Sequence, residues 1–174
     1  MTIEDKLLEI AAYTLPALIT GGVAFVMMQK FYNSEESKRK FELLRENQKQ
    51  ALPIRLQAYE RVVLLLERIN PSQLLMRVAP TGKSKDDYAT ILSHHIQTEF
   101  EHNLTQQIYL TSKTWDIVLK AKNSTVQMIR KNALREDVAD ADKLREAIMI
   151  ELTETEAPSN IAISYLKEEL KRVF

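Results

Sequence analysis

Cysteine is absent from this chain of 174 residues, and only three glycines occur. No disulfide framework can hold the fold, and no thiolate is present as a nucleophile or a metal ligand. Tight β-hairpin turns, which need residues with positive φ, have few places to form. Lys and Arg number 24 and so do Asp and Glu, so the chain has no net charge to attract nucleic acid. These absences speak against a disulfide-stabilised protein, a β-sheet protein and a nucleic-acid-binding protein.

Strong helix formers make up most of the composition instead. Leu, Glu, Lys, Gln, Ala, Arg and Met are abundant throughout the chain. The fold class that we expect is therefore all-α. A chain of this length can supply an N-terminal anchor and still form one globular domain with a sizeable core.

The segment from Ile10 to Met28 contains no charged residue, although 28% of the chain is charged. As a helix it would be about 28 Å long, close to the roughly 30 Å thickness of the hydrocarbon core of a bilayer. The residues before it are mainly acidic and no cleavage site follows it, which speaks against a removable signal peptide. We expect residues 10–28 to form a transmembrane helix in contact with lipid.

Small residues and helix breakers lie inside this expected span, namely Pro16, Ala17, Gly21 and Gly22. Ala17 and Gly21 are four residues apart, so together they form a shallow face that another helix can approach closely. This spacing favours a homo-oligomer or a partner helix. Gly and Ala are also common in membrane helices generally, so the alternative of a span without a partner stays open.

Basic residues gather on the C-terminal side of the span. Lys6 is the one basic residue before it, whereas Lys30, Lys38, Arg39, Lys40, Arg45 and Lys49 follow it. By the positive-inside rule, the N-terminus lies outside and the rest of the chain is cytoplasmic, with a single pass through the membrane. The cluster Lys38–Lys40 is interleaved with glutamates, which favours a solvated surface, with contact to lipid headgroups as the alternative.

The chain divides into three parts by its apolar pattern. Residues 1–32 are the membrane anchor and its flanks, residues 33–51 are nearly all polar and predict a helical stalk, and residues 52–174 show apolar stripes at spacings of three and four. The last part predicts a compact bundle of about five helices. A bend or break is expected at Pro53, and the later helices are expected to begin at Pro71, after Ser84, at Ser112, after Asp140 or Asp142, and at Pro158.

The helix that begins after Ser84 is predicted to reach about Tyr109, with a buried stripe from Tyr88 to Ile108. At 100° per residue, Asn103 and Gln107 fall near the centre of the buried face and Glu99 at its edge. Buried polar groups need partners, which the preceding core helix would supply. The sequence predicts a polar core network, with a ligand-binding or partner-binding pocket as the alternative; its members are Arg55, Gln57, Glu60, Arg61, Glu99, Asn103 and Gln107.

All three histidines lie within residues 94–102. His95, Glu99 and His102 fall on one side of a helix, and Glu99 and His102 have the Glu-x-x-His spacing of helical di-iron proteins. Such a site needs a second Glu-x-x-His, and the chain has no fourth histidine, so no metal site is predicted. The chain also lacks a Gly-rich phosphate loop, a Gly-x-Ser-x-Gly turn and a His-Glu-x-x-His motif. We therefore expect neither an enzyme nor a cofactor.

Two stretches carry a resemblance to a known family. ALPIRLQAYERVVLLLERINPSQLLMRV (Ala51–Val78) and EFEHNLTQQIYL (Glu99–Leu110) resemble an uncharacterised family of the Bacteroidota, short proteins with an N-terminal membrane helix, and the resemblance extends to LPALITGGVAFVM. It implies a bacterial inner-membrane setting and carries no assigned activity, so no catalytic role transfers to any residue.

These observations together predict a single-pass inner-membrane protein. Its cytoplasmic helical domain is expected to bind another protein or to form a homo-oligomer. The alternative is a membrane-tethered sensor that binds a ligand or a metal through Glu99, His102, Asn103 and Gln107.

Overall fold

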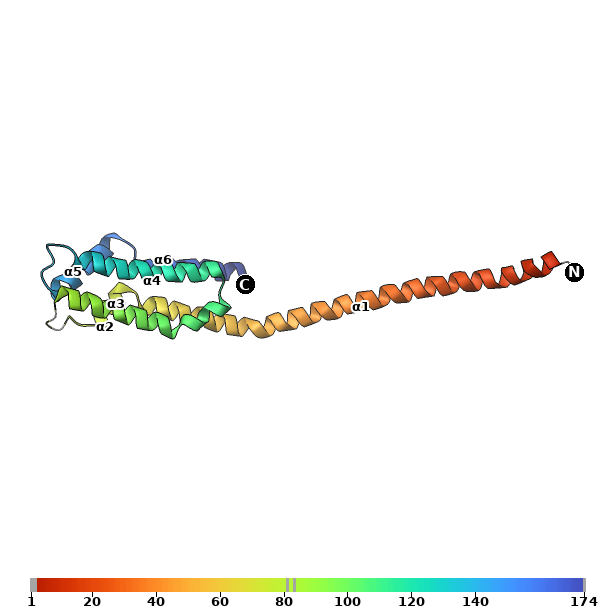
Figure 1. Cartoon of the computed structure of the whole chain (residues 1–174), viewed down its shortest axis with the longest axis horizontal. Helices are drawn as coiled ribbons and strands as arrows, with labels where there is room; N and C mark the ends of the chain where they lie inside the picture. Colours follow the sequence, from red (N-terminus) through yellow and green to blue (C-terminus); the bar gives the residue numbers. More distant parts are fainter. Residues whose placement is uncertain (1–2, 81, 83, 174) are drawn as a thin grey trace. The chain divides into compact units, whose positions relative to one another are not determined.

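The structure is a computed structural model that describes residues 3–80, 82 and 84–173, without the side chains of residues 4–13, 17, 33, 37 and 173. Over these residues the chain forms six α-helices and one 3-10 helix and no strand (Figure 1), which confirms the predicted all-α fold. The elements are α1 (Ile3–Arg68), α2 (Pro71–Arg77), α3 (Lys85–His102), η1 (Leu104–Tyr109), α4 (Ser112–Ala133), α5 (Ala141–Glu154) and α6 (Pro158–Val173).

The chain consists of two compact units, residues 1–51 and residues 52–174. The division falls where the polar segment of the sequence gives way to the apolar stripes. Helix α1 contributes to both units, and its last part, residues 52–68, belongs to the second. The helix does not break at Pro53, because this residue lies within α1; its side chain is exposed.

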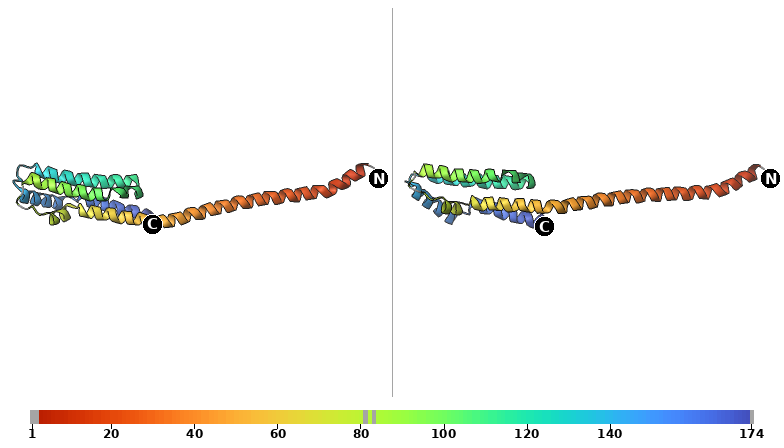
Figure 2. Two further views of the ribbon diagram at one scale, coloured as in Figure 1. Left: turned by 60° about the horizontal axis from the view of Figure 1, so that its bottom comes forward. Right: turned by 90° about the horizontal axis from the view of Figure 1, so that it is seen from below.

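The second unit is a helical bundle in two layers. In both views of Figure 2, α3 and α4 lie side by side, and the end of α1 and α6 lie together beneath them. Helix α4 packs against α3, α5 and α6, while α5 also packs against α2 and α3. The largest fully buried side chains of the core are Tyr88, Leu65, Leu66, Ile69, Leu74, Leu75, Leu92, Ile96, Ile129, Leu144, Ile148 and Leu166.

The predicted helix starts at Pro71, after Ser84, at Ser112 and at Pro158 are confirmed. Of the two aspartates proposed as a cap, Asp140 caps α5, and its side chain accepts a hydrogen bond from the backbone N–H of Lys143 at 2.8 Å. Such side-chain oxygens satisfy backbone donors that lack partners in the first turn of a helix. The other capping bonds run from Ser72 N to Asn70 Oδ1, from Asp87 N to Ser84 Oγ, and from Thr114 N to Thr111 Oγ1.

Helix α3 ends seven residues before the predicted end, because the chain leaves the α-helix at Asn103. The side chain of Asn103 donates to the carbonyl of Glu99 at 2.9 Å, a local bond that competes with helix continuation. The 100° register therefore no longer applies after residue 102. Tyr88, Leu92, Ile96 and Phe100 are buried as predicted, whereas the predicted burial of the next two stripe residues is wrong; Leu104 is 42% and Ile108 72% exposed.

The core face of α1 also differs from the predicted one. The spacing of apolar residues predicts a buried stripe of Leu52, Leu56, Tyr59, Val63, Leu66 and Ile69. Tyr59, Leu66 and Ile69 are buried, whereas Leu56 is exposed and the fully buried side chains also include Val62 and Leu65. The run of consecutive apolar residues around this point fits two neighbouring stripes of the same period, and residues of both are buried, so the core face is turned toward the second stripe. In α4 the spacing predicts Trp115, Leu119, Val126 and Ile129 as core residues. Ile129 is buried and Trp115 and Val126 are half-buried, but Leu119 is exposed and Val118 is buried instead.

The expected membrane segment is exposed wherever its side chains are described. Among the described residues, one helix is long and apolar enough to cross a membrane, and none of its apolar window is buried. Pro16, Gly21, Gly22 and Met28 are exposed, and the side chains of Ile10 and Ala17 lie outside the described ones. The exposed large apolar residues are Leu15, Leu18, Ile19, Val23, Phe25, Val26, Met27 and Met28.

Candidate functional site

Glu99, a predicted member of the polar network at the edge of the buried face, forms ion pairs that the sequence did not indicate. Its Oε1 lies 2.6 Å from Nη2 of Arg68 and 3.8 Å from Nη1 of Arg77, and its side chain is 17% exposed. Arg68 ends α1 and Arg77 ends α2, so this carboxylate joins three helices.

The structure does not bring the other predicted members together in the core. Gln57, Glu60, Arg61 and Gln107 are exposed, while Arg55 and Asn103 are half-buried. The shift of the core face of α1 toward Val62 and Leu65 leaves the three polar residues of α1 at the surface, and Gln107 lies on η1, which has no buried residue.

The histidine cluster has no geometry for a metal. His95 and His102 are exposed, and the carboxylate of Glu99 faces two guanidinium groups. Within the described ranges, no group of three or more His, Cys, Asp or Glu side chains is placed to hold a metal ion.

A polar cluster that sequence reasoning missed links α1, α4 and α6. Thr114 donates a hydrogen bond to Glu169 Oε2, and Thr111 donates to Glu169 Oε1 at 3.1 Å. The buried Tyr59 lies beside them, and its pKa is raised by burial first, then by the negative charge of Glu169 and a hydrogen bond to it. Arg55 lowers the same pKa, so this one member of the predicted network does lie near a polar cluster.

A second missed cluster joins α4 to α5. Asn132 is 1% exposed, and its Nδ2 donates to Glu151 Oε2 at 2.5 Å and to the carbonyl of Met128 at 2.9 Å. Lys131 Nζ lies 3.5 Å from Glu151 Oε1. An asparagine near the end of an amphipathic helix gives no sign in the sequence of which helix will supply its partner. Both clusters hold helices together rather than present reactive groups.

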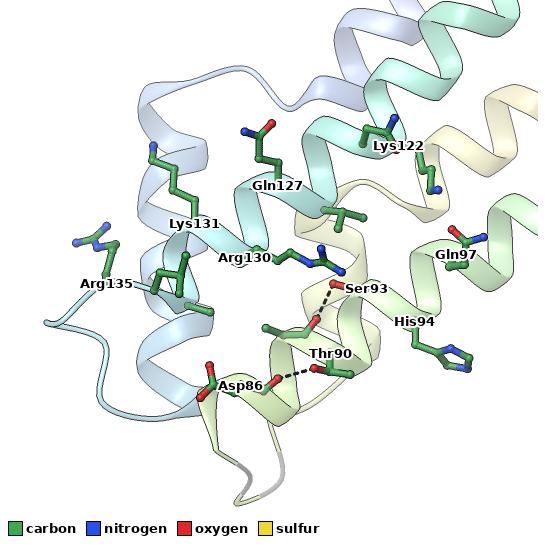
Figure 3. Close-up of a pocket in the computed structure, with 15 residues that line it drawn as sticks. Asp86, Thr90, Ser93, His94, Gln97, Lys122, Gln127, Arg130, Lys131 and Arg135 are labelled. Carbon is green, nitrogen blue, oxygen red and sulfur yellow. Dashed lines mark hydrogen bonds between the residues drawn. The ribbon is translucent and has the colours of Figure 1, made fainter.

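A groove of about 1150 Å³ lies between α3 and α4 (Figure 3). Small and apolar side chains form part of its lining, among them Ala89, Val126 and Ala133. Its charged residues are mostly basic, with Asp86 as the single carboxylate of the lining. The basic members are Lys122, Arg130, Lys131 and Arg135, together with His94.

The basic residues of the groove differ in how they are paired. Arg135 binds Asp137, with Nη2 2.6 Å from Oδ2, and this hydrogen bond lowers the pKa of Asp137. Lys122 Nζ lies 4.9 Å from the ring centre of Phe100, a cation–π contact. Arg130 makes no ion pair with any residue that the structure describes, and Figure 3 shows its side chain extending toward Ser93 of α3. The groove is thus an open surface with one guanidinium group free for a ligand.

Comparison with known proteins places the chain in a family. No curated protein and no solved structure matches it. A family model matches residues 5–173, which include the apolar segment, the polar segment and the whole bundle. The chain therefore belongs to a family of unknown function, DUF7935.

Proposed function

We propose that this chain is a single-pass membrane protein whose helical domain, residues 52–174, binds another protein. The main support for a membrane anchor is the exposure of the large apolar residues between Leu15 and Met28. Their exposed fractions range from 51% for Val26 to 74% for Leu18. An apolar surface on all sides of a helix is stable when lipid covers it, whereas in water each Å² costs about 25 cal/mol. The absence of charge from the same segment supports this.

The few polar groups of the segment also fit a lipid environment. The hydroxyl of Thr20 donates to the carbonyl of Pro16 at 2.8 Å, so it is satisfied within its own helix. Backbone and side-chain polar groups must find such internal partners in a bilayer because no water reaches them. A single helix can therefore cross the membrane here without an unpaired hydroxyl at Thr20.

The distribution of charge supports one orientation. Lys30, Lys38, Arg39 and Lys40 follow the apolar segment and are exposed, whereas Lys6 is the one basic residue before it. By the positive-inside rule, the N-terminus faces outward and the bundle faces the cytoplasm. The bacterial inner membrane is the setting that the resemblance of the two sequence stretches implies.

Binding rather than catalysis is supported by what the polar residues of the bundle do. Glu99, Glu151 and Glu169 are engaged in contacts between helices, so they are held in place by neighbours rather than poised over a pocket. The open groove between α3 and α4 offers a wide surface to a partner. We therefore assign the domain a docking role.

Extraction of membranes with sodium carbonate tests the anchor. The full chain is expected to remain in the membrane pellet. Ile19→Arg combined with Val23→Arg places two charges in the middle of the apolar segment, each costing about 3 kcal/mol on insertion, and should move the protein to the supernatant. Leu43→Arg combined with Leu44→Arg is the matched control, in the polar segment, and should leave the protein in the pellet. Native protein in the supernatant would disprove the anchor.

The lack of cysteine allows a direct test of orientation. Thr2→Cys and Ser164→Cys each introduce a single thiol, one on each side of the expected span. In spheroplasts, a membrane-impermeant maleimide is expected to label the first variant at once and the second only after lysis. The opposite labelling pattern would reverse the orientation while leaving the anchor intact.

A further inference from the structure

The groove between α3 and α4 has the dimensions of a site for one more helix. Its lining residues extend from Asp86 to Gln97 on α3 and from Lys122 to Ala133 on α4, with Leu134 and Arg135 directly after the end of α4. At 1.5 Å per residue, each helical stretch is about 17 Å long, which corresponds to about three helical turns. Where small side chains line the groove between two neighbouring helices, a third helix can pack closely into that groove. Ala89, Ser93 and Ala133 are such small side chains.

The charge of the groove selects the kind of helix that fits. Four Lys or Arg side chains line it, against one carboxylate, Asp86. Lys131 is paired with Glu151 and Arg135 with Asp137, which leaves Lys122 and Arg130 without an ion pair among the described residues. Arg130 reaches toward α3 and has no acidic partner within the described part of the chain. A ligand with carboxylates along one side would form ion pairs with Lys122 and Arg130, and opposite charges across an interface also accelerate association.

Apolar residues in the groove distinguish a helix from a small anion. Leu134 is 82% exposed at the end of α4, and Val126 is half-buried in the lining. A free phosphate would gain nothing from these side chains, whereas an amphipathic helix would cover them with its apolar face. The lining contains no aromatic residue on which nucleobases could stack. Both the shape and the mixed chemistry therefore point to a peptide ligand.

We propose that the groove between α3 and α4 binds an acidic amphipathic helix of a partner protein. The inference rests on the proposed docking role of the domain and names the class of its partner. Residues Lys122, Val126, Arg130 and Leu134, spaced four apart on α4, would alternate basic and apolar contacts along the bound helix.

The test uses the full chain in nanodiscs of zwitterionic lipid and a fluorescein-labelled helical peptide of three to four turns with leucines on one face and glutamates on the other. We expect an increase in fluorescence anisotropy whose midpoint shifts to higher protein concentration as salt is added. A peptide with lysine in place of every glutamate is the ligand control and should not bind. Arg130→Glu should weaken binding of the acidic peptide by about tenfold.

Two further variants separate the apolar and the charged contributions. Leu134→Ser removes apolar contact without a change of charge and should weaken binding by about threefold or more. Lys120→Glu is the matched control, an exposed reversal on the same helix outside the groove lining, and should change affinity by less than about twofold. The fluorescence of Trp115, the single tryptophan, checks that each variant is folded.

Five results would overturn the proposal. Binding that is unchanged in Arg130→Glu, or equal for the basic peptide, would remove the groove as an acidic-helix site. Displacement of the peptide by millimolar inorganic phosphate would make it a small-anion site. Recruitment of the protein to phosphatidylglycerol vesicles that Arg130→Glu abolishes would assign the groove to a lipid surface, and self-association that this variant abolishes would assign it to a second copy. None of these results changes the outcome of carbonate extraction. The proposed groove ligand and the proposed membrane anchor can therefore be disproved independently.

Discussion

Glu99 Oε1 of α3 lies 2.6 Å from Nη2 of Arg68, the last residue of α1. Arg77, the last residue of α2, completes the arrangement, because its Nη2 donates to the carbonyl oxygen of Arg68 at 2.6 Å. One carboxylate and two guanidinium groups thus connect the ends of α1 and α2 to the last turn of α3.

Neutralising this carboxylate should destabilise the bundle. Glu99→Gln removes the charge that both arginines face, and since the site is half-buried we expect the free energy of unfolding to fall by about 1 kcal/mol. Urea denaturation followed by the fluorescence of Trp115 measures the change. Glu101→Gln, on the exposed side of the same helix, is the control and should have less than half this effect. Equal effects of the two variants would show that the ion pairs contribute nothing.

This ion pair shows what sequence periodicity can and cannot predict. The 100° register of α3 correctly placed Glu99 at the edge of the buried face, because that position depends only on the helix itself. Its partners depend on how the chain turns after α1 and after α2, and on which neighbouring stripe of α1 enters the core. The sequence therefore pointed to Arg55 and Arg61, whereas packing brings Arg68 and Arg77 into contact.

Two asparagines of the bundle should differ in their contribution to stability. Asn132→Leu removes the donor to Glu151 from a site that is 1% exposed, and the loss leaves a half-buried carboxylate with the positive charges of Lys131 and Arg135 near it. We expect a loss of about 2 kcal/mol. Asn103→Leu removes one bond to the carbonyl of Glu99 at a half-buried helix end, with an expected loss of about 1 kcal/mol. Thermal unfolding of both variants compares them, and a larger shift for Asn103→Leu would contradict this order.

Local signals in the sequence predicted the helix starts well, and the groove illustrates the limit of such signals. Ser84 and Asp140 cap their helices through bonds to residues three positions ahead, so the sequence alone contains both partners. The groove joins side chains from α3 and α4 that are distant along the chain. The sequence shows the four-residue spacing of Lys122, Val126, Arg130 and Leu134. It does not show which side of α4 is buried, and the burial of Val118 and Ile129 determines how far this stripe is exposed to solvent.

Alkaline pH should weaken the bundle through two buried tyrosines. Burial is the first cause that raises the pKa of Tyr59, followed by the charge of Glu169, and burial also raises the pKa of Tyr88, whose hydroxyl donates to the carbonyl of Val78 at 2.6 Å. A raised pKa in the folded state means that the unfolded chain loses these protons first. Their contribution is complete below about pH 10 and is lost as the pH rises through the folded-state values.

The slope of the unfolding free energy against pH, between about pH 9 and 11, measures this effect. Tyr59→Phe and Tyr88→Phe should each make the decline shallower, even where the variant is less stable at neutral pH. Tyr109→Phe, which alters an exposed side chain, is the control and should keep the native slope. A slope that neither variant changes would exclude the two buried tyrosines as its cause.

Substitution of Gly82 tests the cost of backbone strain without a steric clash of the added side chain. Its φ is +63°, and a Cβ added there would meet no heavy atom within 4 Å, so a side chain costs conformational strain and nothing else. The left-handed region costs an L-residue about 1 to 2 kcal/mol, while alanine recovers about 0.4 to 1 kcal/mol by restricting the unfolded chain. Gly82→Ala should therefore lower the free energy of unfolding by about 1 kcal/mol in urea denaturation. Gly82→Asn should lower it less, because asparagine enters this region more readily. If both substitutions are neutral, the loop between α2 and α3 relaxes to another conformation at no cost.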